Sequence, residues 1–196
     1  MATTTLMDEI DIANEIEVDR LDDELYEVVD GKRIRRLPMS AYSATIASRL
    51  VRKLGMFTDE RGLGETVGEV LFRLPLLADL FRNRRPDVAY VSFGRWPSGR
   101  AMPLKDNAWD VVPNLAVEVI STHDLAEESL QKIGEYFEAG VQLVWVVYPQ
   151  QRLVYVYQTP TRVHILATDD TLDGGAVLPG FQMRVCSLFD TIAPAN

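Results

Sequence analysis

Two acidic residues and a lysine have the side chains and positions that metal-assisted chemistry requires. Asp87 opens an apolar stretch directly after a proline, and Glu118 interrupts the apolar run 115–120. Lys132 falls on a predicted helix, where Tyr136 lies one turn further along the same side. Carboxylates on neighbouring strands can hold a hard cation such as Mg²⁺, for which Mn²⁺ is the expected substitute. Such a cation acidifies a bound water, and a nearby lysine adds positive charge where a phosphoryl group becomes more negative.

Glu118 is the least expected of these residues, because its surroundings in the sequence are apolar. Side chains of a strand alternate between two faces, so Ala116 and Ile120 share the face of Glu118. A buried carboxylate is costly unless something compensates its charge. Two explanations stay open: a bound metal ion offsets the desolvation of Glu118, or Glu118 forms a structural ion pair with Lys132 or an arginine.

The other candidate residues also have plain structural alternatives. Asp87 could be only the first residue of a strand, and Lys132 could be a solvated helix residue that pairs with Glu128. Tyr136 could simply belong to the core. The basic run 32–36 alternates within a predicted hairpin, which is more often a solvated face than a clamp for phosphate.

The elements that must position these residues follow from apolar periodicity and from turn signals. A hairpin is predicted at 25–37, with its turn at Asp30-Gly31. A first helix is predicted from Ser40, as its N-cap, to about Leu54, with Gly55 as its end.

A second helix is predicted to open at Asp124 in a capping box and to run through Glu138. Strands are predicted at 65–75, 86–93, 114–121, 143–149, 152–158, 162–168 and, with a short turn, within 177–190. Strands on either side of two helices indicate a sheet that is covered on both faces.

Composition restricts the classes of protein to which the chain can belong. The net charge of −9 argues against a protein that simply coats nucleic acid, because affinity for phosphate comes largely from Lys and Arg. The basic clusters 32–36 and 82–85 still allow a local contact with DNA, helped by a metal ion. No apolar run is long enough to span a membrane. The single cysteine fits a reducing compartment, so we expect a cytoplasmic protein. Residues 1–20 are expected to form a flexible acidic tail, and residues 21–196 a single domain.

Four sequence motifs follow one another along the chain: RRPDVAYV at 84–91, PNLAVEVIS at 113–121, KxxxYxxAGVxxVWVVYP at 132–149 and LPGF at 178–181. Together they resemble the Uma-type restriction endonuclease family, and the resemblance covers nearly the whole predicted domain. It implies a PD-(D/E)XK, restriction-endonuclease-like fold. This is an α/β fold with a mixed central β-sheet flanked by helices, here with an N-terminal β-hairpin.

The resemblance also implies a Mg²⁺-dependent endonuclease that hydrolyses phosphodiester bonds in DNA. Asp87 and Glu118 match the two metal-binding acids of that superfamily, and the main-chain carbonyl of Val119 is expected to be a third ligand. The lysine that usually stands two residues after the glutamate is replaced by Ile120. The family resemblance suggests that Lys132 takes over its role.

Supporting roles follow from the same resemblance. Glu27 matches an acidic position in the opening hairpin, Tyr136 follows the lysine on the helix, and Tyr42 stands where relatives often carry a histidine. Tyr42 and Ile120 also favour a second hypothesis, in which a catalytically degenerate member of the fold acts as a binding or assembly module. A homodimer, paired through the strands at 152–158 and 162–168, is expected from symmetry alone.

Overall fold

The computed structural model describes residues 25–102, 108–121 and 124–190; the predicted tail at 1–20 lies outside them. Its larger sheet comprises β3 (Gly64–Gly68), β6 (Val88–Ser92), β7 (Leu115–Val119), β8 (Leu143–Tyr148), β9 (Leu153–Thr159) and β10 (Arg162–Leu166). These strands lie in the order β10-β9-β8-β7-β6-β3. β7 is parallel to β8 and the other neighbours are antiparallel, so the predicted mixed sheet is confirmed.

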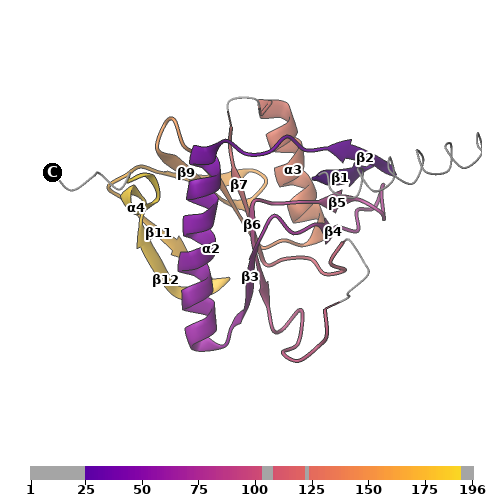
Figure 1. Ribbon diagram of the computed structural model, residues 1–196, viewed down its shortest axis with the longest axis horizontal. Coiled ribbons are helices and arrows are strands. Elements are labelled where there is room, and N and C mark those ends of the chain that lie inside the picture. Colours follow the sequence, from indigo (N-terminus) through magenta and orange to yellow (C-terminus); the bar gives the residue numbers. More distant parts are fainter. Residues whose placement is uncertain (1–24, 103–107, 122–123, 191–196) are drawn as a thin grey trace, which may run out of the picture.

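Two helices, α2 (Ala41–Arg61) and α3 (Ala126–Ala139), cover opposite faces of this sheet (Figure 1). Strand alternation decides which side chains meet which helix. Val117 packs in one core cluster with Leu50 of α2, whereas its neighbour Ala116 packs in the other with Tyr136 of α3. Glu118 has the parity of Ala116 and therefore faces α3. Within the described residues, neither these nor any other helix combines the length and apolar character that crossing a bilayer requires.

A second, smaller sheet carries the predicted hairpin. It comprises β1 (Tyr26–Val29), β2 (Lys32–Arg35), β4 (Phe72–Arg73) and β5 (Asn83–Arg84), in the order β2-β1-β5-β4. The predicted turn is confirmed, because Asp30 and Gly31 have the positive φ values, 50° and 72°, that a tight two-residue hairpin turn requires. The turn is fixed to the segment before β5 by Asp30, whose N–H donates to Asp79 at 2.8 Å. This sheet matters for the site because β1 carries Glu27 and β5 carries Arg84.

The C-terminal part thickens the core on the α2 side. β11 (Thr171–Gly174), β12 (Leu178–Arg184) and the short helix α4 (Cys186–Phe189) bury Leu172, Phe181 and Leu188 in the same cluster as Leu54 of α2. The predicted strand and turn within 177–190 correspond to β12 and α4, whereas β11 was not predicted.

The first helix is longer than predicted. Its N-cap is confirmed, since the Ser40 side chain accepts a hydrogen bond from the N–H of Ser43 at 3.1 Å. The predicted end at Gly55 is wrong: the helix continues to Gly62, which has φ 58°. The buried stripe extends to Thr58, and this packing outweighs the cost of an internal glycine, about 1 kcal/mol.

Two other boundaries differ from the prediction. The predicted strand 65–75 breaks at Glu69, which has φ 52°, and its two halves join different sheets as β3 and β4. Asp124 does not cap α3, because its carboxylate accepts the N–H of Ser121 at 2.6 Å and the helix begins at Ala126. At Glu69 the N–H donates to the carbonyl of Asp87 at 3.2 Å, so in both places a hydrogen bond to the backbone overrides the pattern of side chains.

Candidate active site

Asp87 and Glu118 lie side by side because β6 and β7 are antiparallel. Val88 pairs with Val117, which places the residue before Val88 opposite the residue after Val117. Both acids are buried, with 2% and 6% of their surface exposed. Oδ2 of Asp87 accepts the N–H of Val119 at 2.6 Å, so the carboxylate also fastens the end of β7. The two predicted metal ligands are therefore neighbours across one strand pair.

Helix α3 approaches Glu118 with two of the predicted side chains. The hydroxyl of Tyr136 donates to Oε1 of Glu118 at 2.5 Å, and Nζ of Lys132 lies 3.8 Å from Oε2. Burial, followed by the charge of Glu118, raises the pKa of Tyr136 well above its ordinary value, so this phenol stays a hydrogen-bond donor. Tyr136 is thus both a core residue and a partner of Glu118. Lys132 forms ion pairs with Glu27 and Glu118 rather than with Glu128, the partner that the alternative predicted. Its side chain is only 16% exposed, so it is not a solvated helix residue.

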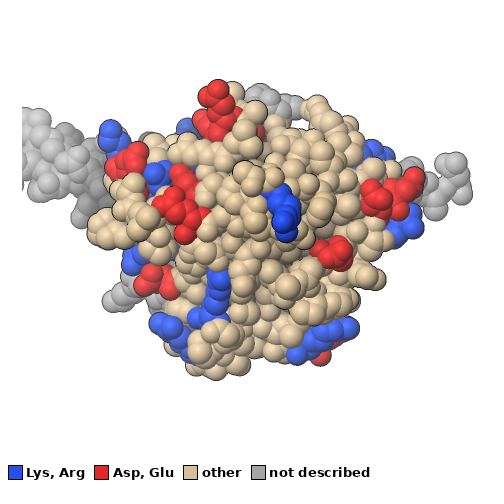
Figure 2. All heavy atoms as spheres, turned by 180° about the vertical axis from the view of Figure 1, so that it is seen from behind, with Lys and Arg blue, Asp and Glu red and all other residues tan. Residues whose placement is uncertain are grey.

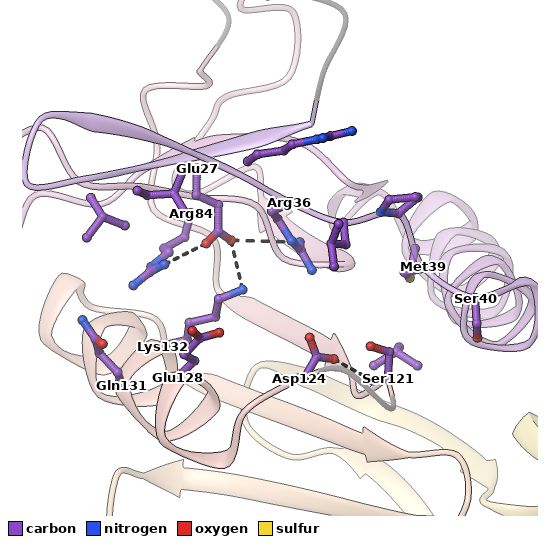
Figure 3. A pocket seen from close by; sticks show the side chains of 16 residues that line it. Glu27, Arg36, Met39, Ser40, Arg84, Ser121, Asp124, Glu128, Gln131 and Lys132 are labelled. Carbon is purple, nitrogen blue, oxygen red and sulfur yellow. Dashed lines mark hydrogen bonds and ion pairs between the residues drawn. The ribbon is translucent and has the colours of Figure 1, made fainter. Parts of the chain in front are cut away.

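Glu27 is a third buried acid, which β1 places above α3 (Figure 3). Its Oε1 lies 3.1 Å from Nζ of Lys132, and its Oε2 lies 2.7 Å from Nη1 of Arg84. Burial by itself raises the pKa of Glu27, but the charges of Lys132, Arg84 and Arg36 together lower it below the ordinary value. Glu27 therefore stays ionised and holds the amino group of Lys132 beside Glu118.

Arg36 joins the three acids, which the sequence analysis did not anticipate. Its Nη2 lies 3.2 Å from Oδ1 of Asp87 and 4.0 Å from Oε2 of Glu118, and its Nη1 lies 4.0 Å from Oε1 of Glu27. Nη1 also donates to the carbonyl of Arg85. Residues 32–35 are exposed, as predicted for a solvated hairpin face, but that prediction is wrong for Arg36. Arg36 follows β2 directly, at the point where the chain turns toward α2.

A second shell of ion pairs surrounds Glu27. Nε of Arg84 lies 2.6 Å from Oε2 of Glu135 on α3, and Nη1 of Arg82 lies 3.1 Å from the other oxygen of Glu135. All three side chains are buried. The alternation within RNRR at 82–85 was the available signal, because it puts Arg82 and Arg84 on one face of a strand. Without a strand predicted at β5, that signal could not be used.

The proximity of the two acids changes the titration of Asp87. Burial raises its pKa most, the charge of Glu118 raises it further, and Arg36 and the Val119 N–H oppose them. The result is a pKa of about 7 for Asp87. When two carboxylates lie this close, the charge of one opposes the ionisation of the other. A nearby cation relieves that repulsion, so such a pair strongly favours one.

A cavity of about 530 Å³ opens beside these residues, between the hairpin, the segment 37–40 and the N-terminal half of α3 (Figure 3). Basic side chains that line it include Arg36, Arg84 and Lys132, and Val119 lies in its wall. A second hollow of about 320 Å³, between α2 and β3, is lined by Asp87. Met39 lines both hollows, whereas Asp87 lines only the smaller one and Val119 only the larger one.

The donor set fits a hard divalent cation that keeps part of its water. Within the described residues, no group of three or more His, Cys, Asp or Glu side chains is placed to hold a metal ion. Asp87, Glu118 and the carbonyl of Val119 are oxygen donors, and Mg²⁺ commonly binds through one or two carboxylates plus waters and substrate phosphate. An ion held by so few protein atoms would be open to a substrate.

The remaining predicted residues lie further out. Tyr42 is on the first turn of α2, 40% exposed, and is not among the residues that line the larger cavity. Ile120 is partly buried, and its N–H bonds the carbonyl of Val147, which leaves the strand position of the missing lysine apolar. The role predicted for Tyr42 stays a prediction.

Positive and negative side chains are interspersed on one face of the molecule. On the face shown in Figure 2, Lys and Arg residues stand apart from one another, most of them close to Asp or Glu. Such a face does not attract a polyanion by its overall charge. Arg36, Arg84 and Lys132, by contrast, lie together along the larger cavity.

Comparison with known proteins agrees with this architecture. The family model Uma2, described as putative restriction endonuclease, matches residues 14–186. A crystal structure described as a putative nuclease belonging to DUF820, from Anabaena variabilis, superimposes with a TM-score of 0.71 at 16% identity. The superposition covers 84% of this chain and 89% of the Anabaena chain. No curated protein matches. The predicted restriction-endonuclease-like fold and the predicted family are therefore confirmed.

Proposed function

The chain belongs to the Uma2 family, and we propose that it is a metal-dependent nuclease that hydrolyses phosphodiester bonds of DNA. The observation that carries the proposal is the convergence of Asp87, Glu118 and Lys132 beside a cavity lined with basic side chains. Buried acids with a perturbed pKa in a cleft are typical of functional sites.

Each residue has a role that follows from its contacts. Asp87, Glu118 and the carbonyl of Val119 would hold Mg²⁺ or Mn²⁺, which when bound polarises a phosphoryl oxygen and acidifies a water. Lys132 places a positive charge at the edge of the cavity, next to Glu118, where it can stabilise the developing charge of a phosphoryl group. Glu27 fixes the amino group of Lys132, and Tyr136 fixes the carboxylate of Glu118. These two are positioning residues.

A second candidate function is a non-catalytic binding or assembly module. It is favoured by the pairing of every buried acid of the site with a base of the chain itself, together with Ile120 at the strand position of the usual lysine. A site neutralised in this way is stable without any metal.

Assembly and location are further proposals. We infer a homodimer through β9 and β10, because β10 is the edge of the larger sheet and exposes Val163 and Ile165. Light scattering after size exclusion tests it: a monomer for both the wild type and Ile165→Lys contradicts it. A cytoplasmic location rests on the single cysteine alone.

The nuclease proposal is tested by calorimetry with Mn²⁺ and by cleavage of single-stranded, duplex and branched DNA. The wild type, Glu118→Gln and Asp87→Asn are compared, since both changes keep the shape of the side chain and remove its charge. We expect the wild type to bind Mn²⁺ and to cleave at least one substrate, and both variants to lose at least 100-fold in cleavage. Folded wild-type protein that binds no Mn²⁺ and cleaves nothing supports the binding module instead.

A further inference from the structure

Arg36 places a cationic group between the carboxylates that are expected to bind the metal. Its Nη2 contacts Asp87 at 3.2 Å and faces Glu118 at 4.0 Å. A guanidinium carries its charge over a planar group with several donors, so it can serve two carboxylates at once. Arg36 therefore meets the same electrostatic need as a divalent cation bound to Asp87 and Glu118.

Electrostatic repulsion shows why both cations do not fit together. Nη2 of Arg36 already lies 3.2 Å from Oδ1 of Asp87 and 4.0 Å from Oε2 of Glu118, the two carboxylates that are expected to hold the metal. A divalent cation bound to the same carboxylates would lie close to the guanidinium in a buried site, where repulsion between like charges is strong. Withdrawal of the Arg36 guanidinium relieves most of that repulsion.

The structure gives Arg36 an anchor and a space into which it can move. Its main-chain N–H donates to the carbonyl of Leu25 at 2.7 Å, which continues the hairpin pairing and holds the backbone. The side chain is 18% exposed and lines the cavity of about 530 Å³. A rotation of the side chain that keeps this backbone bond would carry the guanidinium away from the carboxylates and toward the cavity. Arg84 differs in this respect, because Glu27 and Glu135 hold it on two sides.

We propose that Arg36 is an exchangeable internal cation: it neutralises Asp87 and Glu118 in the metal-free protein, yields its position to the divalent metal, and then turns into the cavity to bind a phosphodiester of the substrate. This proposal rests on the proposed function. In this scheme one movement of the Arg36 side chain both admits the metal and brings the guanidinium to the phosphate. A guanidinium is well suited to the second step, because its paired donors match phosphate oxygens.

The first test is Mn²⁺ calorimetry at pH 8 on the wild type, Arg36→Gln and Arg152→Gln. Arg152 is the matched control, because it forms an ion pair with Asp190 at 3.6 Å between side chains that are 49% and 63% exposed. We expect Arg36→Gln to bind Mn²⁺ at least about tenfold more tightly than the wild type, since the metal no longer displaces a charge-assisted hydrogen bond. Arg152→Gln should change the affinity less than about twofold.

The outcomes separate this proposal from the nuclease proposal. Tighter binding by Arg36→Gln, or binding by that variant alone, supports exchange. Equal or weaker binding by Arg36→Gln, with normal binding by the wild type, overturns exchange and leaves the metal site in place. No binding by either protein overturns the metal site itself and exchange with it.

A second test uses the unsubstituted protein and so does not depend on whether Arg36→Gln folds. In NMR spectra of the metal-free protein, the terminal guanidinium nitrogens of Arg36 should give separate signals, because the Arg85 carbonyl and Asp87 restrict rotation of the group. Saturating Mg²⁺ should release that restriction for Arg36 but not for Arg84, which is the internal control. Unchanged Arg36 signals at saturating Mg²⁺ contradict the exchange.

Discussion

Nζ of Lys132 lies 3.1 Å from Oε1 of Glu27, closer than the 3.8 Å that separates it from Oε2 of Glu118. The lysine expected to act on the substrate is therefore held mainly by an acid of the hairpin, far away in the sequence. Tyr136 bonds one oxygen of Glu118, and the other oxygen faces Lys132 at 3.8 Å and Arg36 at 4.0 Å. The position of one amino group thus links the small sheet to the chemistry of the large one.

Replacement of Glu27 by glutamine should impair cleavage more than metal binding. Without the carboxylate, Lys132 loses its closest partner and Arg84 loses one of two, so we expect a 10- to 100-fold loss of cleavage rate, typical of residues that orient a ligand. The Mn²⁺ affinity should change less than about threefold. A cleavage rate equal to that of the wild type would show that Lys132 needs no such anchor. Lys132→Met is the reference for complete loss of the amino group.

Replacement of Tyr136 by phenylalanine removes one hydroxyl and keeps the ring that fills the core. Glu118 then lacks a hydrogen bond, which should lower the free energy of unfolding by about 1–3 kcal/mol and weaken Mn²⁺ binding about tenfold. Calorimetry and urea unfolding measure the two effects. Tyr90→Phe is the matched control, since its hydroxyl bonds the Leu63 carbonyl at 3.0 Å, away from the site. Equal Mn²⁺ affinities for both variants would remove Tyr136 from the site.

The stability of the metal-free protein should decrease as the pH rises from 5 to 8. Burial and the charge of Glu118 raise the pKa of Asp87 from the ordinary 3.8 to about 7, so in this range the folded state binds more protons than the unfolded state. The stabilisation by protonated Asp87 is fully present below its ordinary pKa and is lost as the pH rises through its pKa in the folded protein. The free energy of unfolding should fall by at most about 1.4 kcal/mol per pH unit. Urea unfolding in the presence of a chelator measures it. Asp87→Asn should flatten the profile, and an unchanged slope in that variant would assign the effect to another group.

Glu27 should make the protein less stable as the pH falls, the opposite of the effect of Asp87. The neighbouring bases lower its pKa below the ordinary 4.5, so its contribution is present above that value and is lost as the pH falls through the lower folded value. Wild-type protein should therefore lose stability below pH 4.5 faster than Glu27→Gln. Parallel profiles for the two proteins in this acid range would be inconsistent with the lowered pKa.

Glu135 should be required for folding rather than for metal binding. Its removal in Glu135→Ala leaves Arg82 and Arg84 without their shared buried acid, which should cost about 3–5 kcal/mol of unfolding free energy. Glu138→Ala is the control on the same helix, because Glu138 is exposed and accepts only the N–H of Leu77 at 3.0 Å. Thermal unfolding followed by circular dichroism compares them. A similar small loss in both variants would show that the ion pairs around Glu135 contribute little.

Local sequence patterns were sufficient to predict some parts of this site and not others. The apolar surroundings of Glu118 and the helical spacing of Lys132 and Tyr136 pointed to residues that the fold does bring together. Arg36 and Glu135 were missed, because their pairing depends on the packing of the hairpin against α3, which no short-range pattern encodes. The internal Gly55 misled for a related reason: the core that keeps α2 helical beyond it is built from distant strands.

The hairpin has one more consequence, which concerns heat. β1 supplies Glu27 to the site and Arg36 follows β2 directly, yet neither strand belongs to the six-stranded sheet, and residues 32–35 are exposed. β2 is short and exposed, and such strands open more readily than a buried sheet, so β2 should detach while the main body stays intact. The site should therefore lose Arg36 reversibly several degrees below the melting temperature, with amide hydrogens of β2 exchanging before those of β7. Heat resistance of the site would then be improved by fastening this hairpin rather than by strengthening the core.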